Sequence, residues 1–168
     1  IFMKFKITLK IDRKYGDLLP FNYLYEQSAV IYRILAQADT QYSSWLHENG
    51  YLLHERKRFK LFCYSPFIFE KVKPLPEGGC LKIIGERAVW YISFIPEKST
   101  LEFIQGIFAH QSFTIGNKKY QVAFDVVGVE AIPMPQLSEE MIFQAQSPIC
   151  VKLHENNKTQ YLSPDNPM

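Results

Sequence analysis

The segment MKFKITLKID, residues 3–12, alternates apolar and polar residues along its whole length. In an extended chain the apolar side chains then share one side and the lysines the other, which is typical of a β-strand with one buried face. The segment predicts an amphipathic strand at the start of a packed sheet. We expect Met3 to be the natural start, and the two residues before it to be additions.

Two helices are expected after this strand. Asn22 is the expected N-cap of a helix that runs to about Ala38. A second, shorter helix over 41–48 ends at Asn49-Gly50, a pair typical of a left-handed helix end. In the first helix, two neighbouring stripes at helical spacing predict the buried side: Leu24, Ser28, Ile31 and Leu35, with Tyr25, Ala29, Tyr32 and Ala36 beside them.

The rest of the first 132 residues favours strands and one more helix. The expected elements are strands at 59–69, 80–84 and 88–95, a helix at 97–110, and a hairpin over 113–132 that turns at Gly116-Asn117. The helix is indicated by Leu101, Ile104, Gln105 and Phe108, which stand at helical spacing. This order is the β-α-β-β-α-β plan, so we predict an α+β, ferredoxin-like domain over 1–132, with one antiparallel sheet and its helices on one face.

A shift in composition follows at Pro133-Met134-Pro135, which predicts a linker over 133–137. Residues 138–168 contain only strand-like segments, expected at 141–145, 149–153 and 160–162. The 168 residues suffice for one domain and part of another. We therefore expect 138–168 to be the start of a second ferredoxin-like domain that is cut short.

Composition excludes several classes of protein. Hydrophobic residues make up 47% and aromatic residues 15%, which excludes a disordered chain. No apolar run approaches the ~20 residues of a membrane span. The three cysteines Cys63, Cys80 and Cys150 are odd in number and widely spaced, unlike a disulfide framework or a zinc site. They predict small core residues in a reduced, cytoplasmic protein.

The net charge of +2 conceals an asymmetry along the chain. Residues 1–96 carry 14 Lys and Arg against 9 Asp and Glu, whereas residues 97–168 carry 5 against 8. The basic excess lies mainly in residues 1–14 and 56–73. It indicates a polyanionic partner for the first half, although such runs are more often solvated surface.

Few residues suggest catalysis. There is no phosphate-binding loop, no nucleotide-binding glycine pattern and no pair of histidines spaced for a metal, so we expect neither a metal site nor a cofactor. His47 stands in the last turn of the short helix, where the helix dipole alone favours it. Tyr32 could be an amphipathic side chain at the edge of the core, and Lys60 a solvated lysine at a strand start. From the residues alone these ordinary interpretations are preferred.

An ordered series of short motifs changes that balance. The motifs are Met-Lys-Phe-Lys-Ile at 3–7, Leu-Pro-Phe-Asn-Tyr-Leu-Tyr at 19–25, Ile-Tyr at 31–32, Leu-His-Glu at 46–48, Lys-Leu-Phe-Cys-Tyr-Ser-Pro-Phe at 60–67 and Gln-Ser-Pro-Ile at 146–149. The series resembles the CRISPR-associated endoribonucleases that cut precursor CRISPR RNA within its repeats. The match covers most of the chain, from Met3 to about Val151.

The resemblance implies two tandem ferredoxin-like domains and cleavage without a metal or other cofactor. The ribose 2′-hydroxyl attacks the scissile phosphate and leaves a 2′,3′-cyclic phosphate and a 5′-hydroxyl. It also implies a site of tyrosine, histidine and lysine, whose positions here are held by Tyr32, His47 and Lys60. A histidine can transfer a proton and a lysine can stabilise the phosphorane charge. His54 is the rival histidine.

Charge adds the expected partners. We predict that repeat RNA contacts two sets of basic residues, namely Lys4, Lys6 and Lys10 on the first strand and Arg56, Lys57 and Arg58 beside the site. For the strand lysines the alternative is protection of an edge strand. The family's glycine-rich loop near the C-terminus has no counterpart, since no glycine follows Gly128.

Two other functions stay open. One is a non-catalytic subunit that holds repeat RNA intact within a CRISPR interference complex, together with other CRISPR-associated proteins. The other is a ferredoxin-like module for protein–protein assembly with no affinity for RNA.

Overall fold

The chain forms two compact units, residues 1–134 and 135–168. The structure, a computed structural model, describes residues 3–53, 57–133, 135–136, 138–145, 149, 151–155 and 158–162. The predicted linker spans the division between the units. That the second unit begins another ferredoxin-like domain stays a prediction.

The first unit is built on one antiparallel sheet in the order β10-β11-β1-β9-β5, with β6 also paired to β9. Its strands are β1 (Met3–Asp12), β5 (Phe62–Tyr64), β6 (Ile68–Phe69), β9 (Arg87–Phe94), β10 (Ser112–Gly116) and β11 (Gln121–Ile132). The predicted strand at 3–12 lies in the middle of this sheet, between β9 and β11. The α+β, ferredoxin-like prediction is confirmed.

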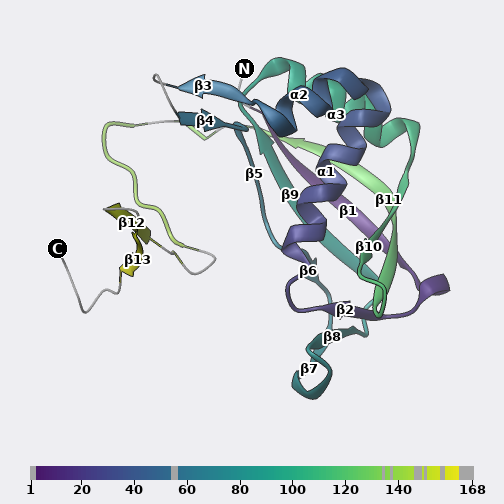
Figure 1. The fold of residues 1–168 in the computed structure, drawn as a ribbon. Coiled ribbons are helices and arrows are strands. Elements are labelled where there is room, and N and C mark those ends of the chain that lie inside the picture. The colour runs from purple at the N-terminus through teal and green to yellow at the C-terminus, as the bar shows by residue number, and fades with distance from the viewer. Residues whose placement is uncertain are drawn as a thin grey trace. The chain divides into compact units, whose positions relative to one another are not determined.

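Three helices lie on one face of the sheet: α1 (Leu24–Ala38), α2 (Thr40–Glu48) and α3 (Glu97–Ala109) (Figure 1). The N-cap expected at Asn22 is wrong, because the residue before α1 is Tyr23 and its side chain makes no capping hydrogen bond. The helix boundaries otherwise agree with the predictions to within two residues.

The stripe predicted on α1 is buried only in part, since Ile31 and Leu35 are buried, and the spaced apolar residues of α3 do not all turn inward. Leu101 and Phe108 are more than half exposed, and Leu24 and Tyr25 are exposed as well. The buried residues of both helices include small or polar ones. On α1 the buried residues are Gln27, Val30, Ile31, Ile34 and Leu35, and on α3 they are Ser99, Thr100, Phe103, Gly106 and Ile107. An apolar pattern does not show that two helices will approach through their smallest residues.

Gly106 is the point of closest approach between α1 and α3. A Cβ at this position would collide with the carbonyl oxygen of Ile34 and would lie 2.8 Å from its carbonyl carbon. Only hydrogen fits there, so the crossing of the two helices is fixed by a single glycine. Beneath it, an aromatic core contains Trp90, Phe103 and Phe124, all completely buried.

The predicted strand over 59–69 is wrong as a single element, because it is interrupted between β5 and β6. Ser65 and Pro66 lie in the break, and the Ser65 hydroxyl accepts a hydrogen bond from the backbone N–H of Tyr91 at 3.0 Å. Proline has no N–H to give to the neighbouring strand, which explains why pairing stops here. On β5, Cys63 is exposed while Cys80 is buried, so the expected core role is wrong for Cys63.

Smaller sheets complete the fold. They are β2-β8-β7, formed by β2 (Leu18–Pro20), β7 (Val72–Leu75) and β8 (Cys80–Ile83), and the hairpin of β3 (Tyr51–Leu53) and β4 (Lys57–Phe59). The second unit contains the hairpin of β12 (Val151–Glu155) and β13 (Lys158–Leu162). The strand predicted at 141–145 is wrong, because no described strand pairs with these residues. No described helix is long and apolar enough to cross a membrane.

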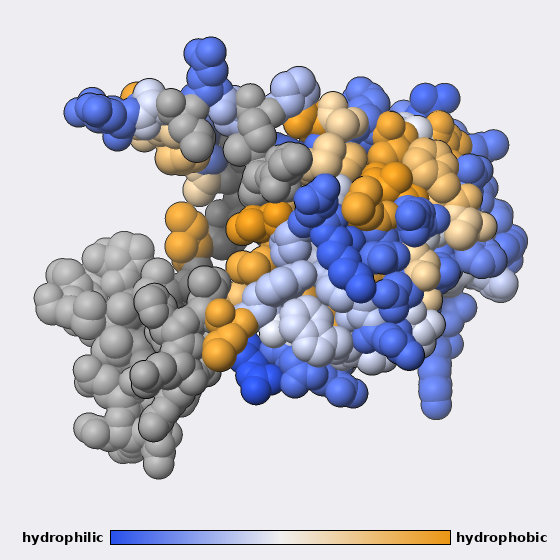
Figure 2. Space-filling model, turned by 90° about the horizontal axis from the view of Figure 1, so that it is seen from above, coloured by the Kyte–Doolittle hydropathy of each residue, from blue (hydrophilic) through white to orange (hydrophobic). Residues whose placement is uncertain are grey.

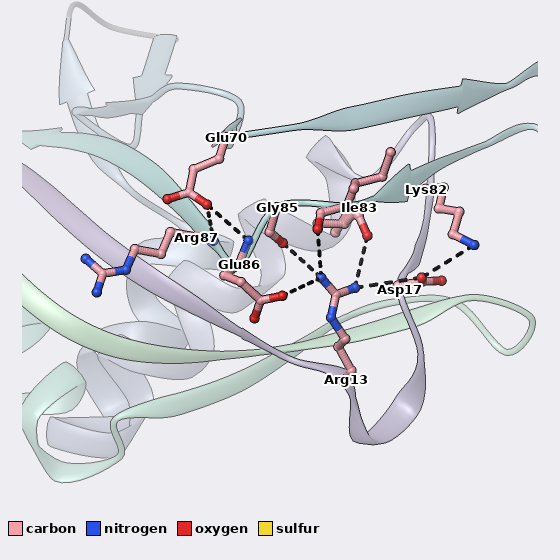
Figure 3. A network of polar contacts seen from close by, with 9 residues as sticks. Arg13, Asp17, Glu70, Lys82, Ile83, Gly85, Glu86 and Arg87 are labelled. Carbon is pink, nitrogen blue, oxygen red and sulfur yellow. Dashed lines mark hydrogen bonds and ion pairs between the residues drawn. The ribbon is translucent and has the colours of Figure 1, made fainter.

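One arginine fastens the turn after β1 to the turn before β9 (Figure 3). The Arg13 guanidinium donates to the carbonyl oxygens of Ile83, Ile84 and Gly85 at 3.0–3.1 Å. It also donates to the Glu86 carboxylate at 3.1 Å. Opposite it, the Glu70 carboxylate accepts the backbone N–H groups of Glu86 and Arg87. These side-chain bonds add to the backbone hydrogen bonds that Ile84 and Gly85 donate to the Lys71 carbonyl and that Glu86 accepts from Ile11.

We expect Gly106→Ala to lower the free energy of unfolding by about 1–3 kcal/mol, because the added methyl forces α1 and α3 apart. Alanine is otherwise better than glycine in a helix by about 1 kcal/mol. Gln105→Ala, at the exposed neighbouring position, is the matched control and should be nearly neutral. Urea unfolding measures both. An equal or greater stability of Gly106→Ala would contradict the close crossing.

Arg13→Ala should lower the free energy of unfolding by about 1–2 kcal/mol, since it removes charge-assisted bonds to several carbonyls at a partly exposed site. Lys14→Ala is the control, because its exposed ion pair with Asp12 at 3.6 Å is expected to contribute less than about 1 kcal/mol. Thermal unfolding of the two variants compares them. If both lose the same stability, the Arg13 network has no special role.

Candidate active site

Helix α2 holds the candidate histidine, and its first turn is fixed by several bonds. The Asp39 carboxylate caps the helix by accepting the Tyr42 N–H at 2.8 Å, and Lys98 pairs with the same carboxylate at 3.1 Å. The Tyr42 hydroxyl bonds to those of Ser99 on α3 and Tyr51 on β3. Burial raises the pKa of Tyr42, so this phenol stays neutral and rigidly bonded.

The amine of Lys60 caps the last turn of α2. The Nζ of Lys60 donates to the carbonyl oxygen of Leu46 at 2.5 Å and also to that of His47. These carbonyls have no partner within the helix and carry the negative end of its dipole. The interpretation of Lys60 as a solvated lysine is wrong, because its amine caps α2.

Gly50 allows Lys60 to approach the helix so closely. Its φ of +69° is left-handed, as predicted for this pair. A Cβ on Gly50 would lie 2.7 Å from the carbonyl oxygen of Phe59 and 3.2 Å from Cδ of Lys60. Beside it, the Arg58 guanidinium donates to the Asn49 side chain at 2.9 Å. The Asn-Gly pair thus lies against β4 and against Lys60, the residue that follows it.

Tyr32 on α1 meets the ring of His47. The ring centroids are 4.9 Å apart and the planes are nearly perpendicular, at 84°. Tyr32 also packs edge-on against Phe62 of β5, with the two ring centroids 5.8 Å apart. The Ser43 hydroxyl donates to the Tyr32 carbonyl at 2.8 Å and so holds α2 against α1. The structure therefore brings Tyr32, His47 and Lys60 together from three separate elements.

The surroundings limit what each group can do. Burial, with a smaller effect of Tyr64, raises the pKa of Tyr32, which therefore remains a protonated phenol that donates hydrogen bonds. Burial, with a smaller effect of Arg58, lowers the pKa of Lys60 and makes it a better proton donor than an ordinary lysine. The His47 side chain is exposed at the end of α2 and open to a ligand.

A cavity of about 420 Å³ adjoins Lys60, and its walls include Arg58, Phe59, Lys60 and Ser93. Leu61, also in its wall, has a φ of +56°, an uncommon conformation for a branched residue. Such strain often accompanies functional sites. Sequence patterns gave no signal for Leu61, or for the contact of Phe62 with Tyr32.

The predicted basic residues separate into two groups. Lys4, Lys6 and Lys10 alternate with the buried residues of β1, so they lie on the sheet face opposite the helices. Lys4 stands 5.1 Å from the Tyr91 ring centroid and Lys6 pairs with Glu130 at 3.0 Å. Protection of an edge strand is the wrong explanation for these lysines, because β1 lies between β9 and β11.

The other basic group is only partly described. Arg58 is exposed beside Lys60. Lys57 is placed by its backbone in β4, while Arg56 and the rival His54 lie outside the described residues. RNA contact by either basic group stays a prediction.

The end of the molecule that carries α2 and β3 combines hydrophilic side chains with apolar patches (Figure 2). Exposed large apolar residues of these and neighbouring elements include Trp45, Leu52 and Phe59. Aromatic groups beside cations suit a single-stranded nucleic acid, whose bases stack while its phosphates pair with the cations.

Comparison with known proteins connects this geometry to a family. One curated relative, from Methanocaldococcus jannaschii, is described as CRISPR-associated endoribonuclease Cas6 1, and it is 26% identical over 165 residues. The alignment covers 96% of this chain and 59% of the relative, so the chain spans well under two thirds of that protein.

Solved structures agree in fold. A RAMP protein described as binding different RNA substrates has a TM-score of 0.71 at 25% identity, over 98% of this chain and 64% of its own. A Cas6-related protein from Pyrococcus furiosus has a TM-score of 0.75 at 24% identity, over 99% and 64%. The family model for the N-terminal part of CRISPR-associated protein Cas6 matches residues 18–125, which include Tyr32, His47 and Lys60. This chain belongs to the Cas6 family.

Proposed function

We propose that this protein is a metal-independent endoribonuclease that cleaves precursor CRISPR RNA within its repeats. Two contacts at the end of α2 carry the proposal. The His47 ring packs against the Tyr32 ring, and the Lys60 amine donates a hydrogen bond to the His47 backbone carbonyl. Family membership and the endoribonuclease named among the relatives support the substrate class.

The proposed reaction is an internal transfer at phosphorus. The 2′-oxygen attacks the phosphorus in line as its proton leaves, and the bond from phosphorus to the 5′-oxygen breaks as that oxygen gains a proton. The products are a 2′,3′-cyclic phosphate and a 5′-hydroxyl. The step consumes no water and needs one proton acceptor, one proton donor and stabilisation of the phosphorane charge.

His47 is proposed as the group that transfers protons, because imidazoles serve as general acids and bases in many enzymes. Its side chain is exposed at the end of α2, where Lys60 and Arg58 also bind. Tyr32 orients the ring and donates a hydrogen bond, since its raised pKa excludes it as a base at neutral pH. An ammonium has three N–H groups. Two on Lys60 meet helix carbonyls, and the third remains for a phosphate oxygen.

The test of this proposal is cleavage of repeat RNA in excess chelator, with the longest chain that the gene encodes. We expect one cut per repeat whose upstream fragment resists 3′-end ligation and whose downstream fragment accepts a phosphate from polynucleotide kinase. A cut that requires a divalent metal contradicts the mechanism. Tight binding without a cut supports the non-catalytic subunit, and absence of salt-sensitive binding supports the assembly module.

His47→Ala should lower the single-turnover rate at saturating RNA by at least about 100-fold, the usual effect of losing a proton-transfer group. His110→Ala, at the exposed residue after α3, is the matched control and should cleave at the parental rate. His54→Ala tests the rival. Parental cleavage by His47→Ala together with loss in His54→Ala would assign the role to His54.

Lys60→Ala should lower the same rate by at least about 10-fold and also destabilise the protein by about 1–3 kcal/mol, because the carbonyls of α2 lose a charged donor. Lys71→Ala, an exposed lysine elsewhere, should change neither quantity. Rates are measured well below the unfolding temperature of each variant. An unchanged rate with lowered stability would make Lys60 a structural cap only.

A further inference from the structure

Asn49, the residue that follows α2, has a side chain that the end of the helix does not require. Its φ of −101° and ψ of −63° are helical, so other residues fit its backbone, whereas the left-handed turn falls on Gly50. Its backbone N–H completes the helix by donating to the Trp45 carbonyl at 2.8 Å. The side-chain amide therefore has a different role.

That amide holds Arg58 of β4. The Arg58 guanidinium donates to Oδ1 of Asn49 at 2.9 Å. Because a guanidinium can only donate hydrogen bonds, the amide must turn its oxygen towards it. A neutral amide fixes the direction of the guanidinium without cancelling its charge, as a carboxylate would do. The bond therefore orients a cation and leaves its charge available.

The charge of Arg58 is not used within the part of the chain that the structure describes. Its side chain is exposed, and none of the described carboxylates pairs with it. By contrast, Lys6 pairs with Glu130 at 3.0 Å and Lys98 with Asp39 at 3.1 Å. A guanidinium has five N–H donors, so others remain for a ligand. Two parallel bonds from a guanidinium suit the oxygens of a phosphate.

Lys60 brings a second cation to the same surface. Arg58 and Lys60 both line the cavity of about 420 Å³ beside the end of α2. The Lys60 amine bonds to the carbonyls of Leu46 and His47 and Arg58 bonds to Asn49, so both charges are anchored to one turn of chain. Burial and, to a smaller extent, the charge of Arg58 lower the pKa of Lys60. Two cations so close repel each other, and an anion between them relieves that repulsion.

We propose that Asn49 is a positioning residue for RNA binding, which holds Arg58 so that Arg58 and Lys60 together bind the phosphates of a strand at the end of α2. The choice of RNA as the polyanion rests on the proposed function, whereas the bond from Arg58 to Asn49 is independent of it. Charge alone led us to expect an RNA contact at Arg58. The amide adds order, because a long side chain that is already fixed avoids the cost of being ordered on binding.

The experiment measures binding of uncleaved repeat RNA by fluorescence anisotropy. It uses the His47→Ala variant of the longest chain that the gene encodes, so that cleavage plays no part. Titrations at several salt concentrations give both the affinity and the number of phosphates contacted. For a single strand, the slope of log K against log salt becomes shallower by about 0.7 for each phosphate contact that is lost.

Arg58→Ala, added to this variant, should weaken binding by about 10-fold through loss of a charged donor and make the slope shallower by about 0.7. Asn49→Ala should weaken binding by about 2–10-fold, the cost of ordering one long side chain, and leave the slope unchanged. Asn49→Asp keeps the arginine in place but neutralises it, so its slope should match that of Arg58→Ala.

The double variant separates positioning from a general role in ending the helix. Asn49→Ala should cause no further loss of affinity when Arg58 is already alanine, because its effect passes through that side chain. Gln41→Ala removes an exposed amide from the other end of α2, and Lys71→Ala removes an exposed positive charge elsewhere. Both controls should bind RNA as the His47→Ala protein does. Thermal unfolding verifies that each variant is folded at the temperature of the titration.

Failure here is distinguishable from failure of the cleavage proposal, since the titrations measure no cleavage. Unchanged affinity in Asn49→Ala, or an equal loss from it with and without Arg58, overturns the positioning role even if the parent protein cuts RNA. A protein that binds no RNA at low salt overturns it as well. A parent that binds repeat RNA without cutting it overturns the proposed reaction and leaves the role of Asn49 to be decided by the double variant.

Discussion

The crossing of α1 over α3 at Gly106 is the constraint on which the rest of the first unit depends. Because no side chain separates the two helices there, the distance and rotation of α1 above the sheet are fixed by backbone contact. The same rotation turns Tyr32 towards β5 and Arg33 towards β10. The candidate active site therefore depends on this crossing, because a change in it would move Tyr32 relative to β5.

The fold could be predicted from the sequence where periodicity decides it. The alternation in 3–12 and the helices near 24–38 and 97–109 define the ferredoxin-like order. The Asn49-Gly50 pair predicted the left-handed backbone found at Gly50. The buried helix faces could not be predicted, because Gly106 contributes to packing by having no side chain. The break at Ser65-Pro66 was also missed, since aromatic residues on both sides disguise it as one strand.

The candidate site was predictable only through likeness to a family. Taken one at a time, Tyr32, His47 and Lys60 have ordinary explanations. Lys60 does have a structural role, because its amine caps the end of α2. That contact nevertheless fixes the lysine beside the histidine it was predicted to assist. The lysines of strand β1 show another limit. The alternating pattern predicted the polar face on which they lie, but it could not tell on which side of the sheet the candidate site lies.

The interruption between β5 and β6 has a consequence for the solubility of this unit. These strands form one border of the main sheet, and an unbroken border of backbone N–H and carbonyl groups can recruit a strand from another molecule. Here Pro66 has no N–H, and the Ser65 backbone oxygen already accepts the Gln27 amide at 3.0 Å. The interruption thus leaves two short, separate segments in place of a continuous template, and it protects a chain rich in aromatic residues against aggregation.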